Sequence, residues 1–201
     1  APDGPWLYFS SHVLGGQYPL FSRRLKAGGP DQLLFDGNAL AKGLDYFSFG
    51  DISISPDQSL AAWSYDDKGS EFYDVRVRDL ASGAEHDDLL TNTSGGAVWA
   101  RDGKCFFYTM QDENHRPLKT FRHVLGTKQA DDVLVYEEKD TGLFTGVGAT
   151  SSEKFIIVSA HDHDTSECWL IDADKPDEKP RLVASRTEKI EYDIEHWNDR
   201  F

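Results

Sequence analysis

Short apolar runs and polar clusters alternate along almost the whole chain. The apolar or alternating runs are four to six residues long, and clusters of Gly, Pro, Asp and Ser separate them. This spacing is typical of strands joined by turns. Helical periodicity is weak, because the best candidate, Asn38–Lys42, is short and is interrupted by glycine. The pattern therefore predicts an all-β fold.

A polar turn followed by a buried strand recurs three times. Asp57–Ser64 aligns without gaps with Asp102–Thr109, which lies 45 residues later, and with Ser152–Ser159, another 50 residues later. Each copy is preceded by an apolar stretch and is followed by a second strand, a turn and a last strand. Four short strands in about 45 to 50 residues make one β-propeller blade.

We therefore predict a single partial β-propeller domain over residues 5–201, with blades of four antiparallel strands. The predicted blades are approximately 5–50, 51–94, 95–141 and 142–187, and residues 188–201 begin a partial fifth. This count does not end where a closed ring ends, so we interpret the chain as part of a larger propeller. An open arc exposes strand edges, which favours self-association. A closed four-bladed ring is the alternative.

The net charge indicates which classes of partner the protein repels and which it attracts. The chain has 35 acidic and 21 basic residues, and its formal net charge is -14. Such a surface repels the phosphates of nucleic acids and anionic lipids, and it attracts cationic ligands such as Lys- and Arg-rich peptides. The alternative is that the acidity serves only solubility.

The cysteines and the longest apolar run indicate the cellular compartment in which we expect the protein. Cys105 and Cys168 are the only cysteines, and both lie in apolar strand-like runs, so we expect buried free thiols in a reducing compartment. The longest apolar run begins at Phe155 and is far too short to span a bilayer. The first residues show no signal peptide. We therefore predict a cytoplasmic protein.

Several polar groups resemble catalytic or metal sites. His161-Asp162-His163-Asp164 has His-x-His spacing, but the repeat places it in a loop, so we favour a solvated loop over a metal site. Three pairs of adjacent carboxylates fall in predicted turns, and we expect them to be solvated turn residues. They are Asp66-Asp67, Asp87-Asp88 and Asp131-Asp132. Ser94–Gly96 is predicted as a turn between blades.

Aromatic and basic side chains recur at repeat positions. We favour blade-to-blade packing over peptide stacking for Trp63, Trp99, Trp169 and Phe121. A second group either lines a central channel or ties blades together by ion pairs, and the pattern does not choose. These residues are Arg76, Arg78, Arg122 and His123.

Four stretches carry a recognisable set of motifs. They are Ser55–Gly69, Glu71–Gly83, Phe121–Glu138 and Thr165–Asp174, and they include Arg-His-Val-Leu-Gly-Thr and Val-Tyr-Glu-Glu. In their order and spacing they resemble the oligopeptidase B branch of the prolyl oligopeptidase family of serine peptidases. The resemblance implies roughly the first four of seven blades, together with an α/β-hydrolase catalytic domain. It also implies a propeller that caps the active site and restricts substrates to short peptides, cleaved after Arg or Lys.

Catalytic machinery is absent from this sequence. There is no Gly-x-Ser-x-Gly elbow, which an α/β-hydrolase needs for its nucleophile. We predict no catalytic, cofactor-binding or metal-binding residue, and we expect the isolated chain to be inactive. The predicted partners are short basic peptides and the C-terminal catalytic domain, with no nucleic acid and no membrane. The main alternative is a non-enzymatic propeller that acts as a protein-binding platform, and a weaker one is a carbohydrate- or metal-binding propeller.

Overall fold

The structure is a computed structural model that describes residues 2–201, and its strands form three antiparallel sheets. The first sheet has the order β1-β2-β3-β4 and forms blade 1. Its strands are β1 (Pro2–Asp3), β2 (Trp6–Ser11), β3 (Leu20–Leu25) and β4 (Gln32–Asp36). A short helix, α1 (Gly37–Leu40), follows, because the Asp36 carboxylate accepts hydrogen bonds from the backbone N–H groups of Asn38 and Ala39.

The second sheet has seven strands in the order β11-β10-β9-β8-β7-β6-β5. They are β5 (Ser48–Ile54), β6 (Leu60–Asp66), β7 (Tyr73–Asp79), β8 (Glu85–Trp99), β9 (Cys105–Gln111), β10 (Pro117–Val124) and β11 (Val133–Glu137), with a 3-10 turn, η1 (Gln129–Asp131), before β11. The first part of β8 pairs with β7 and the second part pairs with β9. This one strand therefore completes blade 2, which begins at β5, and opens blade 3, which ends at β11.

The predicted turn at Ser94–Gly96 is wrong, because these residues lie within β8. The register shifts between Thr93 and Ala97, and Asn92 and Gly95 have positive φ angles. A glycine tolerates this left-handed conformation without a steric penalty. The chain therefore bends here and passes from one blade to the next without leaving the sheet.

The third sheet forms blade 4 and has the order β12-β13-β14-β15. Its strands are β12 (Phe144–Ala149), β13 (Phe155–His161), β14 (Ser166–Asp172) and β15 (Arg181–Ala184). The segment 188–201, expected to begin a further blade, forms no named strand in the described chain; an isolated bridge joins Trp197 to Arg200. Instead it lies against blade 4, where the Ser166 N–H donates to the Ile190 carbonyl.

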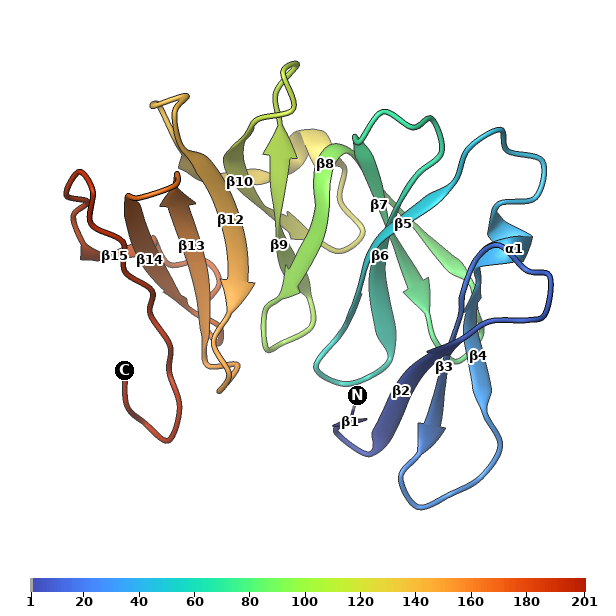
Figure 1. The fold of residues 1–201 in the computed structure, drawn as a ribbon. Helices are drawn as coiled ribbons and strands as arrows, with labels where there is room; N and C mark the ends of the chain where they lie inside the picture. Colours follow the sequence, from blue (N-terminus) through green and yellow to red (C-terminus); the bar gives the residue numbers. More distant parts are fainter. Residues whose placement is uncertain (1) are drawn as a thin grey trace.

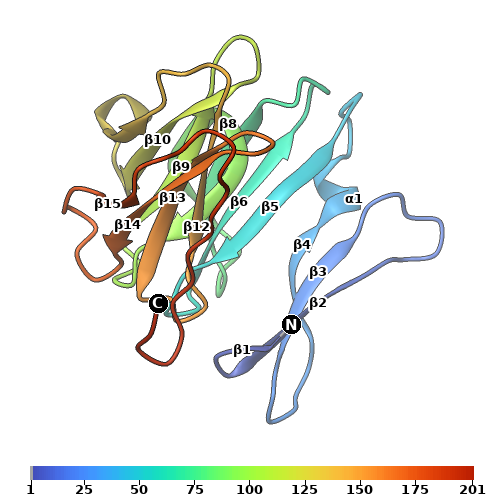
Figure 2. The same cartoon turned by 60° about the vertical axis from the view of Figure 1, so that its left-hand side comes forward.

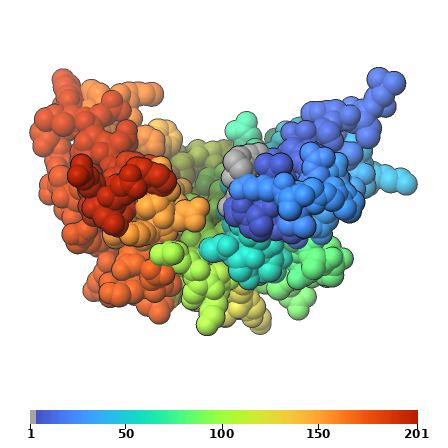
Figure 3. All heavy atoms as spheres, turned by 90° about the horizontal axis from the view of Figure 1, so that it is seen from below, coloured from blue at the N-terminus to red at the C-terminus, as the bar shows by residue number. Residues whose placement is uncertain are grey.

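The blades stand side by side and fan out in an open arc (Figure 1). Figure 2 shows the 188–201 segment crossing in front of blade 4. Seen from below, the surface is hollowed between the N-terminal and C-terminal blades (Figure 3). The fold is the predicted all-β propeller arrangement, and neither of its helical turns, α1 and η1, is long or apolar enough to span a membrane.

The same turn opens the second strand of blades 2, 3 and 4. Its first residue accepts a hydrogen bond from the backbone N–H two positions later, as Asp57 does from Ser59, Asp102 from Lys104 and Ser152 from Lys154. Its next residue has a positive φ: Gln58, Gly103 and Glu153. A backbone bond closes each turn, from Ser55 to Leu60, from Ala100 to Cys105 and from Thr150 to Phe155. The spacing read from the sequence is therefore a repeat of backbone geometry.

The hydrophobic cores lie between blades. Phe35, Phe47 and Trp63 centre the cluster between blades 1 and 2, whereas Trp99 and Phe106 belong to the cluster that joins blades 2 and 3. A third cluster, including Phe107 and Val158, joins blades 3 and 4. Each such buried side chain contributes about 1.5–3 kcal/mol relative to an exposed one. The prediction of blade-to-blade packing for the tryptophans is confirmed.

Candidate functional site

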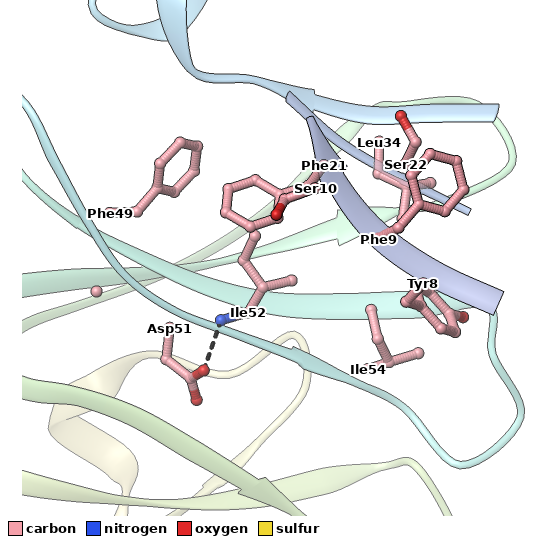
Figure 4. Close-up of a pocket in the computed structure, with 11 residues that line it drawn as sticks. Tyr8, Phe9, Ser10, Phe21, Ser22, Leu34, Phe49, Asp51, Ile52 and Ile54 are labelled. Atoms are coloured by element: carbon pink, nitrogen blue, oxygen red, sulfur yellow. Dashed lines mark hydrogen bonds between the residues drawn. The ribbon is translucent and has the colours of Figure 1, made fainter. Parts of the chain in front are cut away.

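An apolar cleft separates blade 1 from blade 2. It has a volume of about 430 Å³ and is walled by β2, β3, β4 and β5 (Figure 4). The lining residues are mostly aromatic or branched aliphatic: Tyr8, Phe9, Ser10, Phe21, Ser22, Leu34, Phe49, Gly50, Asp51, Ile52 and Ile54. Phe21 and Phe49 meet edge to face across it, with ring centroids 5.0 Å apart.

Polar contacts fix the position of blade 1 at this cleft. The Tyr8 hydroxyl donates to the Gln58 side-chain oxygen at 2.6 Å, and an Arg23 guanidinium N–H donates to the Gln58 carbonyl at 2.7 Å. Gln58 belongs to the first turn of blade 2, so both bonds join the two blades. The Asp51 carboxylate accepts the N–H of Ile52 and points away from the aromatic wall (Figure 4).

The lining of the cleft suits the binding of an apolar group. Its lining side chains include no histidine, cysteine, lysine or arginine. The one carboxylate in the lining, Asp51, accepts the Ile52 N–H and points away from the aromatic wall (Figure 4). An apolar side chain fits such a cleft, and its aromatic rings supply most of the contact area.

Small residues allow the first strands of blades 2 and 3 to approach each other. Gly50 lies on β5 and Gly95 on β8, and between them is Ser64, whose side chain is buried. The Ser64 hydroxyl donates to the Gly95 carbonyl at 2.6 Å and accepts the Asp51 N–H at 2.8 Å. A β-carbon at Gly50 would overlap this hydroxyl and come within 2.8 Å of the Tyr73 ring. Sequence inspection missed this group because its spacing matches no known motif.

The structure places the candidate metal ligands apart from any complete site. His161 ends β13 and His163 lies in the following loop; both are outside the protein core. The Asp162 carboxylate accepts the backbone N–H groups of Asp164 and Thr165, which makes it a turn-forming residue. No group of three or more His, Cys, Asp or Glu side chains in residues 2–201 is arranged to hold a metal ion.

The expectation that all the paired aspartates are solvated is wrong for one member of each pair. Asp66 is 2% exposed, and its carboxylate accepts the backbone N–H groups of residues 68, 69 and 71. The side chains of Asp88 and Asp132 are 1% and 0% exposed, and both bind His123. Burial is tolerated because every one of these carboxylates has hydrogen-bond donors around it.

At each blade junction a basic side chain contacts the neighbouring blade, and Arg78 and His123 of the four candidates are among these side chains. Arg78 in blade 2 donates to the Leu34 carbonyl of blade 1 at 2.8 Å. His123 in blade 3 lies 2.9 Å from Asp88 on the blade 2 part of β8. Arg186, which follows blade 4, pairs with Glu138, which follows blade 3, at 2.6 Å.

Of the other two basic candidates, Arg76 makes its contact within blade 2, and Arg122 makes its contact between blades 3 and 4. The Arg76 guanidinium donates to the Tyr65 hydroxyl at 3.3 Å, and Arg122 pairs with Asp177.

Cys105 and Cys168 are buried free thiols, as predicted, and burial raises the pKa of the Cys105 thiol to about 11. Neither thiol has the lowered pKa that a reactive cysteine requires.

Comparison with known proteins places this fold in a sequence family. Residues 2–201 match the family described as prolyl oligopeptidase, N-terminal beta-propeller domain. The chain is 33% identical over 213 residues to dipeptidyl aminopeptidase BI of Pseudoxanthomonas mexicana, covering 98% of this chain and 29% of that protein. It is 33% identical over 204 residues to protease 2 of Moraxella lacunata, covering 98% of this chain and 30% of that protein.

Solved structures agree with the sequence comparison. Oligopeptidase B from Leishmania major superposes with a TM-score of 0.92 at 25% identity, over 96% of this chain and 28% of that one. The closed form of oligopeptidase B from Trypanosoma brucei gives 0.89 at 29% identity, with 96% and 28% coverage. The chain thus spans less than a third of the length of these relatives. It belongs to the prolyl oligopeptidase family, as an N-terminal β-propeller domain.

Proposed function

We propose that this chain is the substrate-restricting propeller of a serine oligopeptidase. The observation that carries the proposal is the family match over residues 2–201, combined with coverage of only 29% and 30% of two peptidase relatives. The remaining length of such relatives leaves room for a catalytic α/β-hydrolase domain as the partner of the propeller. The apolar and aromatic lining of the cleft fits a role in binding and gating.

The preferred substrates of the whole protein are short peptides that are cleaved after Arg or Lys. The net charge of -14 supports this, because an acidic cap concentrates cationic peptides near the active site. The buried free thiols of Cys105 and Cys168 are consistent with a cytoplasmic protein.

Peptide hydrolysis by the protein that contains this chain tests the proposal. Two series of short peptides should differ only in the residue before the scissile bond, Arg or Lys in one and Ala or Glu in the other. We expect a higher kcat/KM for the basic series, and a decline of that advantage as salt is raised. The same sequences fused to a folded domain should resist cleavage, whereas the 201-residue chain alone should cleave none of them.

Each unexpected result of this experiment refutes a different part of the proposal. Equal rates for both series would refute the basic preference but leave the gating role. Cleavage of the fused substrates at the same rate would refute gating. A protein that hydrolyses no peptide and instead captures other proteins would favour the binding platform.

A further inference from the structure

His123 lies between two buried carboxylates. Its Nδ1 atom is 2.8 Å from an Asp132 oxygen, and its Nε2 atom is 2.9 Å from an Asp88 oxygen. The side chains of His123 and Asp88 are each 1% exposed, and that of Asp132 is 0% exposed. Phe106 packs against the imidazole with ring centroids 5.2 Å apart, which adds an apolar wall. Water is therefore excluded from both ring nitrogens.

Between two ionised carboxylates, counting donors distinguishes the neutral ring from the protonated ring. A neutral imidazole carries one N–H and one lone pair, so it can donate to only one of the two carboxylates. The other ring nitrogen would then present its lone pair to a carboxylate oxygen in a buried site, which is strongly unfavourable. An imidazolium donates from both nitrogens and satisfies both contacts.

The other groups around the cluster reinforce this arrangement. The Tyr108 hydroxyl on β9 donates to the second Asp132 oxygen at 2.8 Å, and the Gly126 N–H donates to Asp88 at 2.6 Å. His86, also on β8, has its Nδ1 atom 3.9 Å from Asp88. The tyrosine hydroxyl and the glycine N–H are donors to the two carboxylates, whereas His86 lies beyond hydrogen-bond distance. A doubly protonated His123 ring adds one further donor to each carboxylate.

We propose that His123 is a buried imidazolium at neutral pH and acts as a pH-sensitive tie between blades 2 and 3. Asp88 belongs to the last strand of blade 2, whereas His123 and Asp132 belong to blade 3, so the cation bridges the junction. Loss of the proton breaks one of the two bonds and loosens that junction. This inference does not depend on the identity of the substrate.

The sign of the pH dependence follows from the surroundings of the ring. Burial disfavours the charged form, but the hydrogen bonds that the ring donates to Asp132 and Asp88 outweigh it, so the pKa of His123 is raised. An unfolded chain has a histidine pKa of about 6.5. The stabilisation is therefore complete below that pH, and it is lost as the pH rises through the folded pKa.

Nitrogen NMR of the histidine-labelled chain tests the protonation directly. The chain has seven histidines, and comparison with His123→Gln assigns the signal. We expect both ring nitrogens of His123 to remain protonated at neutral pH, where exposed histidines are largely neutral. A single protonated nitrogen at neutral pH, or titration together with the exposed histidines, would overturn the proposal. If that variant fails to fold, the unaltered chain still tests the proposal, because a spectrum in which no histidine keeps both ring nitrogens protonated at neutral pH overturns it.

Unfolding as a function of pH tests the tie. The native chain should have a higher unfolding midpoint than His123→Gln, and this difference should become smaller as the pH rises. If His123 contributed only packing, the difference would stay constant with pH. Asp88→Asn replaces the carboxylate with an amide that donates to Nε2, so this variant should titrate His123 at lower pH. Asp87→Asn removes the same charge one residue away, where the side chain is exposed, and should leave the His123 titration unchanged. Equal effects of the two Asn variants on that titration would contradict the proposal.

Discussion

The buried hydroxyl of Ser64 gives a sharp test of how blades 2 and 3 are held together at their first strands. The side chain is 0% exposed and makes two hydrogen bonds, to the Asp51 N–H at 2.8 Å and to the Gly95 carbonyl at 2.6 Å. Ser64→Ala removes only the oxygen atom and creates almost no cavity. The measured change therefore reports the two bonds and the cost of leaving their partners unpaired.

The expected loss can be worked from these contacts. Each ordinary hydrogen bond contributes about 1 kcal/mol net, and a buried group left without a partner costs about 1–3 kcal/mol. Two bonds in this position correspond to a loss of roughly 2–3 kcal/mol in the free energy of unfolding. For a chain of this size, 1 kcal/mol lowers the unfolding temperature by about 2–4 °C, so Ser64→Ala should lower it by about 4–12 °C.

Denaturant and thermal unfolding of Ser64→Ala beside Ser94→Ala measure this loss. Ser94 lies on β8, next to Gly95, but its side chain is exposed and its hydroxyl makes one long bond, 3.3 Å, to the Thr109 carbonyl. The control should change the free energy by no more than about 0.5 kcal/mol, the range of surface substitutions. If the two variants lose the same amount, water replaces the missing hydroxyl at residue 64 and the argument from burial is refuted.

Two further substitutions test the close approach of strands and the ties between blades. Gly50→Ala should destabilise the chain by about 1–3 kcal/mol in denaturant unfolding, because the new β-carbon meets the Ser64 hydroxyl and the Tyr73 ring; Gly96→Ala, with no atom within 4 Å, should be close to neutral. Arg186→Lys keeps the charge but cannot span Glu138 and Glu167 as the guanidinium does, so we expect a loss of about 1 kcal/mol that shrinks at high salt. An unchanged or larger loss at high salt would mean that packing, and not the ion pairs, holds this junction.

The repeat could be predicted because its signals are local. A turn residue such as Asp57 accepts a hydrogen bond from the backbone two positions later, and its counterpart Asp102 does the same. The apolar strand that follows each turn needs only its own sequence to be recognised. The positions of the strands that follow these turns, and of the tryptophans in the cores, therefore followed from the spacing.

The charged ties could not be predicted, because they depend on partners that are distant in sequence. Asp88 looks like half of a solvated pair, and only the fold brings it to His123, 35 residues away. The turn expected at Ser94–Gly96 failed for a related reason, since glycine and serine mark turns in general but here permit a bend within a strand. The cleft depends on the separation between blades 1 and 2, which no local pattern encodes.

The continuity of β8 has a consequence for where this propeller can be cut or rearranged. Splitting the chain between blades 2 and 3 would divide a strand that is hydrogen-bonded on both sides of the break, so the two halves should not survive as separate pieces. The connections at residues 41–47 and 138–143 contain no named strand and offer better sites for circular permutation or for grafting. The smallest unit of this molecule that can be moved without cutting a strand at this junction is therefore a double blade.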